Sequence, residues 1–257
     1  MLELLIAQLK WSSIQYRRYA SEAIGGVIAL TATFYGLFLS ASYIGGGSVR
    51  FGDRLDSVIV GYVLWSLVIF IMGGIPGTLQ REAQVGTLEQ LFISPFNATQ
   101  ILLFRAIGDL IIQTFLISIV LIIIMVTTGR WLSFSPALIL PFITVVLGAY
   151  GIAFAAGGLA LIFKSIQQLL GIFNFALLFL LTIPTETWSG TQQVLGWILP
   201  MTTGAGLLRD LMARSQPLAL PLLGLALLNG LVYFALGVSL FRWAERAAKR
   251  RGKLAGY

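Results

Sequence analysis

The sequence predicts an all-α protein that crosses a membrane six times as a single domain. Of its 257 residues, 58% are hydrophobic and only 11% are charged, whereas soluble domains carry about 25% charged residues. Apolar runs of about 18 or more residues with few charges are typical of transmembrane helices. We expect spans at roughly 23–44, 57–79, 99–127, 136–163, 168–185 and 217–241, the fifth barely long enough, in one transmembrane domain over 1–257.

The first twenty residues predict an amphipathic helix that lies in the membrane interface. Leu2, Leu5, Ile6 and Leu9 recur roughly at helical spacing, but basic residues accompany them, so the segment is too short and too charged to span. A polar lead-in to the first span is an equal alternative. We expect no signal peptide, because charges fall within and after the apolar part.

The distribution of Lys and Arg predicts which side of the membrane each loop faces. Arg50, Arg54, Arg130, Arg209 and Arg214 fall on one side of the predicted spans, and the other twelve of the 17 basic residues fall on the opposite side. Because cytoplasmic loops are enriched in Lys and Arg, we expect both termini and the loop at 81–100 in the cytoplasm. We interpret the net charge of +7 as membrane orientation rather than nucleic-acid binding.

The absence of His and Cys excludes several kinds of chemistry. The chain cannot form a disulfide, a thiolate nucleophile, a His general base or a zinc site of the usual ligand types. The predicted spans contain no paired carboxylates either. A membrane-embedded enzyme is therefore disfavoured.

A few residues inside the predicted spans indicate contacts between helices. Asp109 follows Arg105 by one helical turn, which predicts an intramembrane i, i+4 pair near the cytoplasmic end of the third span. We favour a structural role for this pair over a functional one. Glycines at 25–26, 148–151 and 157–158 are expected to let helices approach closely. Asn229 either bridges helices or faces a transport pathway.

The most polar internal segment is REAQVGTLEQLFISPFNATQ, between the second and third spans. Thr87 can cap a short helix, and Pro95 favours an end to it. Two helical turns are unstable alone in water, so this helix must pack against something. The residues leave two interpretations open, an ordinary polar loop with caps or a helix that docks into a cytoplasmic partner. The apolar face of the helix consists of Leu88, Leu91 and Phe92.

This segment resembles the region after the second span in membrane subunits of ABC-2 type transporters. The pattern in that family is approximately Glu, a few residues, Gly-Thr-aliphatic-Glu, two to five residues and Pro. Pro200 and Arg209 are similar to the family's late Pro and its short helix with Arg. Six spans, cytoplasmic termini and a basic tail match the family over essentially the full chain. The matching residues in the polar segment are Glu82, Gly86, Thr87, Leu88, Glu89 and Pro95.

The resemblance implies a permease subunit of an ATP-driven exporter in a bacterial-type cell membrane. The translocation path would need a second permease copy, as a homodimer or a related heterodimer. Two copies of a separate ATP-binding subunit would bind ATP and Mg, because this chain has no phosphate-loop motif and is expected to be neither an ATPase nor a cofactor-binding chain. The stretch 186–215 resembles a pair of re-entrant helices on the outer side. The helix at 87–94 would be the coupling helix, with coupling residues Glu82, Gly86, Thr87, Leu88, Glu89, Leu91, Phe92 and Pro95.

A second function class remains open, namely an ion- or proton-coupled carrier with no ATPase partner. Inverted repeats or broken helices at matching positions would support it, and the sequence shows neither convincingly. The transported substrate is not indicated. Drugs, lipids, polysaccharides and other amphiphiles all fit the resemblance.

Overall fold

The computed structural model describes residues 20–44, 54–93, 97–163 and 166–250, and their regular structure is helical throughout. The all-α prediction is therefore confirmed for these ranges, while nearly all of the expected interface helix lies outside them. The long helices are α2 (Ala20–Ile44), α3 (Arg54–Val85), α5 (Ala98–Thr128), α6 (Ile139–Phe163) and α10 (Leu220–Arg250). The shorter elements are α4 (Leu88–Ile93), η1 (Pro136–Leu138), α7 (Gln167–Thr182), η2 (Thr185–Thr187), α8 (Thr191–Ile198) and α9 (Thr202–Ala213).

Five of the predicted spans are long and apolar enough to cross a membrane, those of α2, α3, α5, α6 with η1, and α10. The span expected at 168–185 corresponds to α7, which has only 16 residues. Its length of about 24 Å is less than the hydrocarbon core of about 30 Å. The helix ends early because Pro184 disfavours helical geometry in the residue before it, and Ile183 is extended, with φ −71° and ψ 132°. The sixth crossing stays a prediction.

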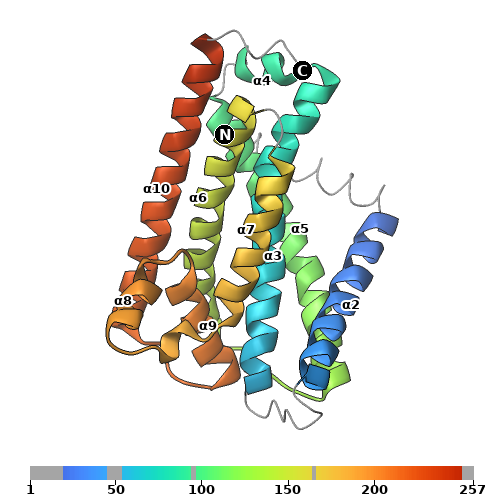
Figure 1. The fold of residues 1–257 in the computed structure, drawn as a ribbon, viewed down its shortest axis with the longest axis vertical. Helices are drawn as coiled ribbons and strands as arrows, with labels where there is room; N and C mark the ends of the chain where they lie inside the picture. Colours follow the sequence, from blue (N-terminus) through green and yellow to red (C-terminus); the bar gives the residue numbers. More distant parts are fainter. Residues whose placement is uncertain (1–19, 45–53, 94–96, 164–165, 251–257) are drawn as a thin grey trace.

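The long helices run side by side along the long axis of the molecule (Figure 1). The central helix α3 packs against α5, α6, α7 and α9, and α6 packs along α10. Helix α2 stands apart at one side, where α5 is its main described neighbour. The short helix α4 lies at the end where α10 finishes, whereas α8 and α9 lie at the opposite end. The two regions singled out by the resemblance are thus at opposite ends of the bundle.

Helices α6 and α10 approach each other closely along a row of small residues. A Cβ atom added at Gly151 would meet the backbone carbonyl group of Tyr233, and one added at Gly237 would meet the carbonyl group of Gly151. Gly158, two helical turns after Gly151, also lies against α10. The close approach expected from the glycines of this span is confirmed. The glycines at 25–26 make no such contact, because an added Cβ there meets nothing within 4 Å.

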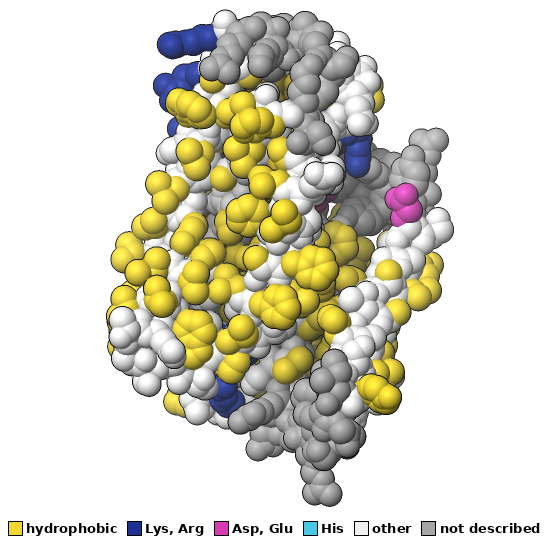
Figure 2. All heavy atoms as spheres, viewed as in Figure 1, with side chains coloured by type: hydrophobic (Ala, Val, Ile, Leu, Met, Phe, Trp, Pro, Cys, Tyr) yellow, Lys and Arg dark blue, Asp and Glu magenta, His cyan; other side chains and the backbone are white. Residues whose placement is uncertain are grey.

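On the face shown in Figure 2, large apolar side chains cover the middle of the molecule, and basic side chains lie toward its two ends. Ile172 and Phe175 in α7 and Ile28 in α2, for example, are all more than half exposed. Apolar surface on this scale marks a region that contacts membrane or another protein. Together with the five long apolar helices, this surface identifies a multi-pass membrane protein.

Candidate functional site

Helix α3 ends in a tight turn at Gly86, whose φ of 79° lies in the left-handed region that glycine adopts without steric cost. The Gly86 N–H donates to the Ala83 carbonyl (3.2 Å), and the Thr87 N–H donates to the Glu82 carbonyl (2.9 Å). This pair of bonds is the Schellman pattern that closes a helix. Helix α4 then begins with a bond from the Leu91 N–H to the Thr87 carbonyl (3.3 Å). The predicted helix start at Thr87 is confirmed.

Three polar side chains join α3, the start of α4 and α5, and we call them the Glu82 cluster. Arg105 Nη1 donates to Glu82 Oε1 at 3.1 Å, and the Thr87 hydroxyl donates to Glu82 Oε2 at 2.5 Å. The Arg105 and Glu82 side chains are only 14% and 23% exposed. Charge-assisted bonds of this kind are stronger than bonds between neutral groups. The cluster therefore fixes the start of α4 to the ends of two long helices.

Leu88 lies inside the chain's own core, which corrects the prediction that it contacts a partner. The side chain is 2% exposed and belongs to the main hydrophobic cluster. Leu91 and Phe92 are half-buried against the same cluster, and the Lys249 ammonium of α10 lies 5.2 Å from the centre of the Phe92 ring. The short tether to α3 holds the apolar face of α4 against the bundle. The described residues between positions 81 and 100 that stay exposed are Arg81, Gln84, Val85, Gly86, Gln90, Asn97 and Gln100.

Two predicted coupling residues cannot be placed, because the Glu89 side chain and Pro95 lie outside the described part of the structure. The described ion-pair partner of Arg105 is Glu82. The pairing of Arg105 with Asp109 therefore stays a prediction, although both side chains line the same cavity between α2, α3 and α5.

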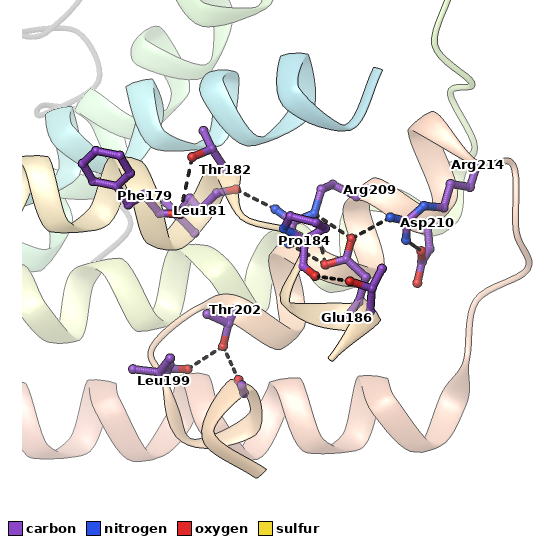
Figure 3. A network of polar contacts seen from close by, with 12 residues as sticks. Phe179, Leu181, Thr182, Pro184, Glu186, Leu199, Thr202, Arg209, Asp210 and Arg214 are labelled. Atoms are coloured by element: carbon purple, nitrogen blue, oxygen red, sulfur yellow. Dashed lines mark hydrogen bonds and ion pairs between the residues drawn. The ribbon is translucent and has the colours of Figure 1, made fainter. Parts of the chain in front are cut away.

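A second charged site lies at the opposite end, where α7, η2 and α9 meet (Figure 3). Arg209 in α9 is fully buried. Its Nε donates to Glu186 Oε1 at 3.0 Å, and its Nη2 donates to Glu186 Oε2 at 2.6 Å. Its Nη1 donates to the Leu181 carbonyl at 2.6 Å, one of the last carbonyls of α7, which have no partner within the helix. The guanidinium thus joins the end of α7 to η2 and α9.

Arg214 extends this site, which we call the Glu186 network (Glu186, Arg209, Asp210 and Arg214). Arg214 Nη2 lies 3.0 Å from Glu186 Oε1, and Nη1 lies 2.6 Å from Asp210 Oδ1. This network was not predicted from the sequence, where Arg209 and Arg214 were assigned only to one side of the membrane and Arg209 was also matched to the family resemblance. The signal that could have indicated it is the presence of opposite charges, Glu186 and Arg209, in a largely apolar stretch. Charged side chains that become buried in such a stretch require partners of opposite charge.

Asn229 of α10 holds the chain between α8 and α9. Its Nδ2 donates to the Trp197 carbonyl at 2.9 Å, and its Oδ1 accepts from the Met201 N–H at 3.3 Å. The Tyr233 hydroxyl donates to the Ile198 carbonyl at 3.0 Å. Of the two roles left open for Asn229, the structure shows helix bridging. The re-entrant depth of α8 and α9 stays a prediction.

Both sites connect the ends of helices. Each consists of ion pairs and hydrogen bonds that fix helix ends relative to one another. Within the described residues, no group of three or more His, Cys, Asp or Glu side chains is arranged to hold a metal ion.

No protein-family model matches the chain. Among curated proteins, it is similar to the probable multidrug ABC transporter permease YbhR of Escherichia coli strain K12 and to the protein of the same name from Escherichia coli O157:H7. Identity is 33% over 134 residues in both cases. The match covers 48% of this chain and 34% of each relative, about a third of their length. This distant similarity supports a relationship to ABC transporter permeases.

Proposed function

We propose that this chain is the permease subunit of an ATP-driven exporter of the ABC-2 type, and that a separate ATP-binding subunit acts on it at the junction of α3, α4 and α5. The observation that carries the proposal is the Glu82 cluster, whose hydrogen bonds fix the start of a short helix to two long apolar helices. The similarity to an ABC transporter permease supports the same conclusion.

The junction suits the transmission of movement. The Gly86 turn and the Glu82 cluster restrict α4 relative to α3 and α5, and Leu88 anchors it in the core. A partner that displaces α4 therefore moves the ends of two long helices instead of bending a loop. Such rigid-body movement of packed helices is a common form of switching. The partner would contact the exposed residues of the junction, among them Val85 and Gln90.

The proposed transporter contains two permease chains and two ATP-binding subunits. The second permease is another copy of this chain or a related one, and ATP and Mg bind to the ATP-binding subunits. The end that carries α4 faces the cytoplasm together with both termini, in the inner or plasma membrane. Because the relatives are named multidrug permeases, amphiphilic drugs are included among the proposed cargo.

The proposal is tested by copurification with the ATP-binding subunit. Val85 is 71% exposed beside the Gly86 turn, so Val85→Asp places a charge on the proposed contact surface without disturbing the core. We expect Val85→Asp and Leu91→Asp each to lower recovery of the ATP-binding subunit at least about tenfold, the factor that corresponds to about 1.4 kcal/mol. The measurement is the stoichiometry of the affinity-purified complex, with its ATPase rate.

Val194→Asp in α8 is the matched control, because Val194 is 47% exposed at the opposite end of the bundle. It should leave the stoichiometry unchanged. Normal assembly and normal ATPase coupling in both junction variants would refute the docking surface. Transport without any ATP-binding subunit would instead establish the ion- or proton-coupled carrier.

A further inference from the structure

A cavity of about 540 Å³ lies between α2, α3 and α5. Its volume falls in the range of about 300–1,000 Å³ that is usual for ligand sites. Three glycines of its α3 wall leave the space open, because a Cβ added at Gly73, Gly74 or Gly77 meets nothing within 4 Å. All three helices are long and apolar enough to span a membrane, so the cavity lies where lipid is the surrounding solvent.

The α5 wall of the cavity changes from charged to apolar along the helix. Arg105, Asp109 and Gln113 are four residues apart and all line the cavity, which places them on one face of α5. Ile117 and Val120 continue the lining toward the other end. One face of a single helix thus offers a polar section followed by a hydrocarbon-like section.

The walls from α2 and α3 have the same gradient. On α3 the lining runs from Arg81 at one end to Phe70, and on α2 it runs from Glu22 to Leu30. Helices α2 and α5 run antiparallel to α3 in the bundle. The charged sections of all three walls therefore meet at one end, the end that carries α4, and the apolar sections meet toward the middle of the bundle. The cavity as a whole is amphipathic.

The charged end carries both signs. Arg81 and Arg105 contribute guanidinium groups, and Glu22 and Asp109 contribute carboxylates. Arg105 also pairs with Glu82 at 3.1 Å, which leaves less of its positive charge available to a purely anionic group. A purely anionic headgroup would face two carboxylates and a purely cationic one two guanidinium groups, whereas a zwitterion finds a partner for each of its charges.

We propose that this cavity binds a phospholipid with a zwitterionic phosphoethanolamine headgroup. The phosphate contacts Arg81 and Arg105, the ammonium contacts Glu22 and Asp109, and the acyl chains lie along the apolar walls. This binding site goes beyond the proposed ATPase coupling and does not depend on it, since the chain alone contains the whole lining described above.

The first test fills the cavity. The full chain is purified in detergent and incubated with equimolar phosphatidylethanolamine and phosphatidylglycerol, and bound lipid is counted by native mass spectrometry. We expect retained phosphatidylethanolamine in the wild type and at least about a tenfold loss in Gly74→Leu, which occupies the space. Gly171→Leu is the matched control, because an added Cβ at Gly171 in α7 also meets nothing within 4 Å but lies outside this cavity.

The second test removes the headgroup contacts. Arg81→Gln and Asp109→Asn should each lower the preference for phosphatidylethanolamine over phosphatidylglycerol about tenfold, as expected for a lost charge-assisted contact. The control is the thermal unfolding midpoint of each variant, which should stay close to that of the wild type if the variant is folded. Equal retention of the two lipids by the wild type, or unchanged retention in all three cavity variants, would overturn the proposal. A loss of dimer mass in Gly74→Leu would do so as well, since a second copy of the chain would then fill the space.

Because these measurements use the chain without an ATP-binding subunit, their failure leaves the proposed coupling untouched. Failure of the Val85→Asp test, in turn, leaves the lipid site untouched.

Discussion

Arg209 is the largest side chain that is fully buried among the described residues. A guanidinium group stays charged in proteins, so its burial has a desolvation cost that its partners must offset. The bidentate contact with Glu186 and the bond to the Leu181 carbonyl provide those partners. Gly206 makes room for them, because a Cβ added there would lie 3.2 Å from the Glu186 Cβ. The buried position of Arg209 therefore depends on several residues together, and no one of them indicates the site by itself.

Arg209→Met should destabilise the fold by about 3–5 kcal/mol, the usual result when one partner of a buried ion pair is removed. Arg214→Met is the matched control, because the Arg214 side chain is 30% exposed, and it should cost about 1 kcal/mol or less. The measurement is the free energy of unfolding by denaturant in detergent. The double change Arg209→Met with Glu186→Met should recover much of the loss, because apolar packing often replaces a buried pair without cost. Similar losses in the two single variants would contradict this account.

At the scale of elements, the contact between α6 and α10 depends on the absence of side chains. Lipid offers no hydrophobic driving force between helices, so close backbone approach and van der Waals packing stabilise their association. Gly151 and Gly237 face each other at this contact. Helix α10 in turn carries Asn229, which binds the chain between α8 and α9. The spacing of two helices thus also positions the segments at the far end of the bundle.

Gly151→Ala should lower stability by about 1–3 kcal/mol or more, because the new methyl group would meet backbone atoms of Tyr233 that cannot move independently. Gly171→Ala, in the exposed part of α7 with open space around it, should be neutral or slightly stabilising, as alanine is the better helix former. Thermal unfolding midpoints of the two variants measure the difference. Equal midpoints would mean that α10 can shift away from α6 without loss.

On the scale of the whole molecule, α4 and the pair α8 and α9 lie at opposite ends of the bundle. If these ends face opposite sides of a membrane, the chain must cross three times between them, through α5, α6 and α7. Whether the third of these crossings is complete depends on α7, which has only 16 residues. The Glu186 network at its end joins it to η2 and α9, which gives the chain a fixed structure beyond the point where the helix stops.

The chain has no Cys, so a single introduced cysteine is its only thiol. Chemical labelling of that thiol therefore shows on which side of the membrane the position lies. In intact cells a membrane-impermeant maleimide should modify Gln216→Cys and spare Gln90→Cys, whereas both should react after lysis; both positions are exposed. Labelling of both, or of neither, in intact cells would place the two positions on one side. In that case α7 does not cross the membrane, and the chain has five spans.

The sequence by itself determined where the long apolar helices lie and that a short helix starts at Thr87. These features are local, because lipid forces each spanning segment to satisfy its backbone hydrogen bonds internally and because a helix start depends on a few adjacent residues. Only the tertiary structure decided that Leu88 faces the chain's own core, that Arg209 is buried against Glu186, and that Asn229 bridges helices. Periodicity shows that a helix has an apolar face, but the surface that covers this face comes from residues distant in the chain.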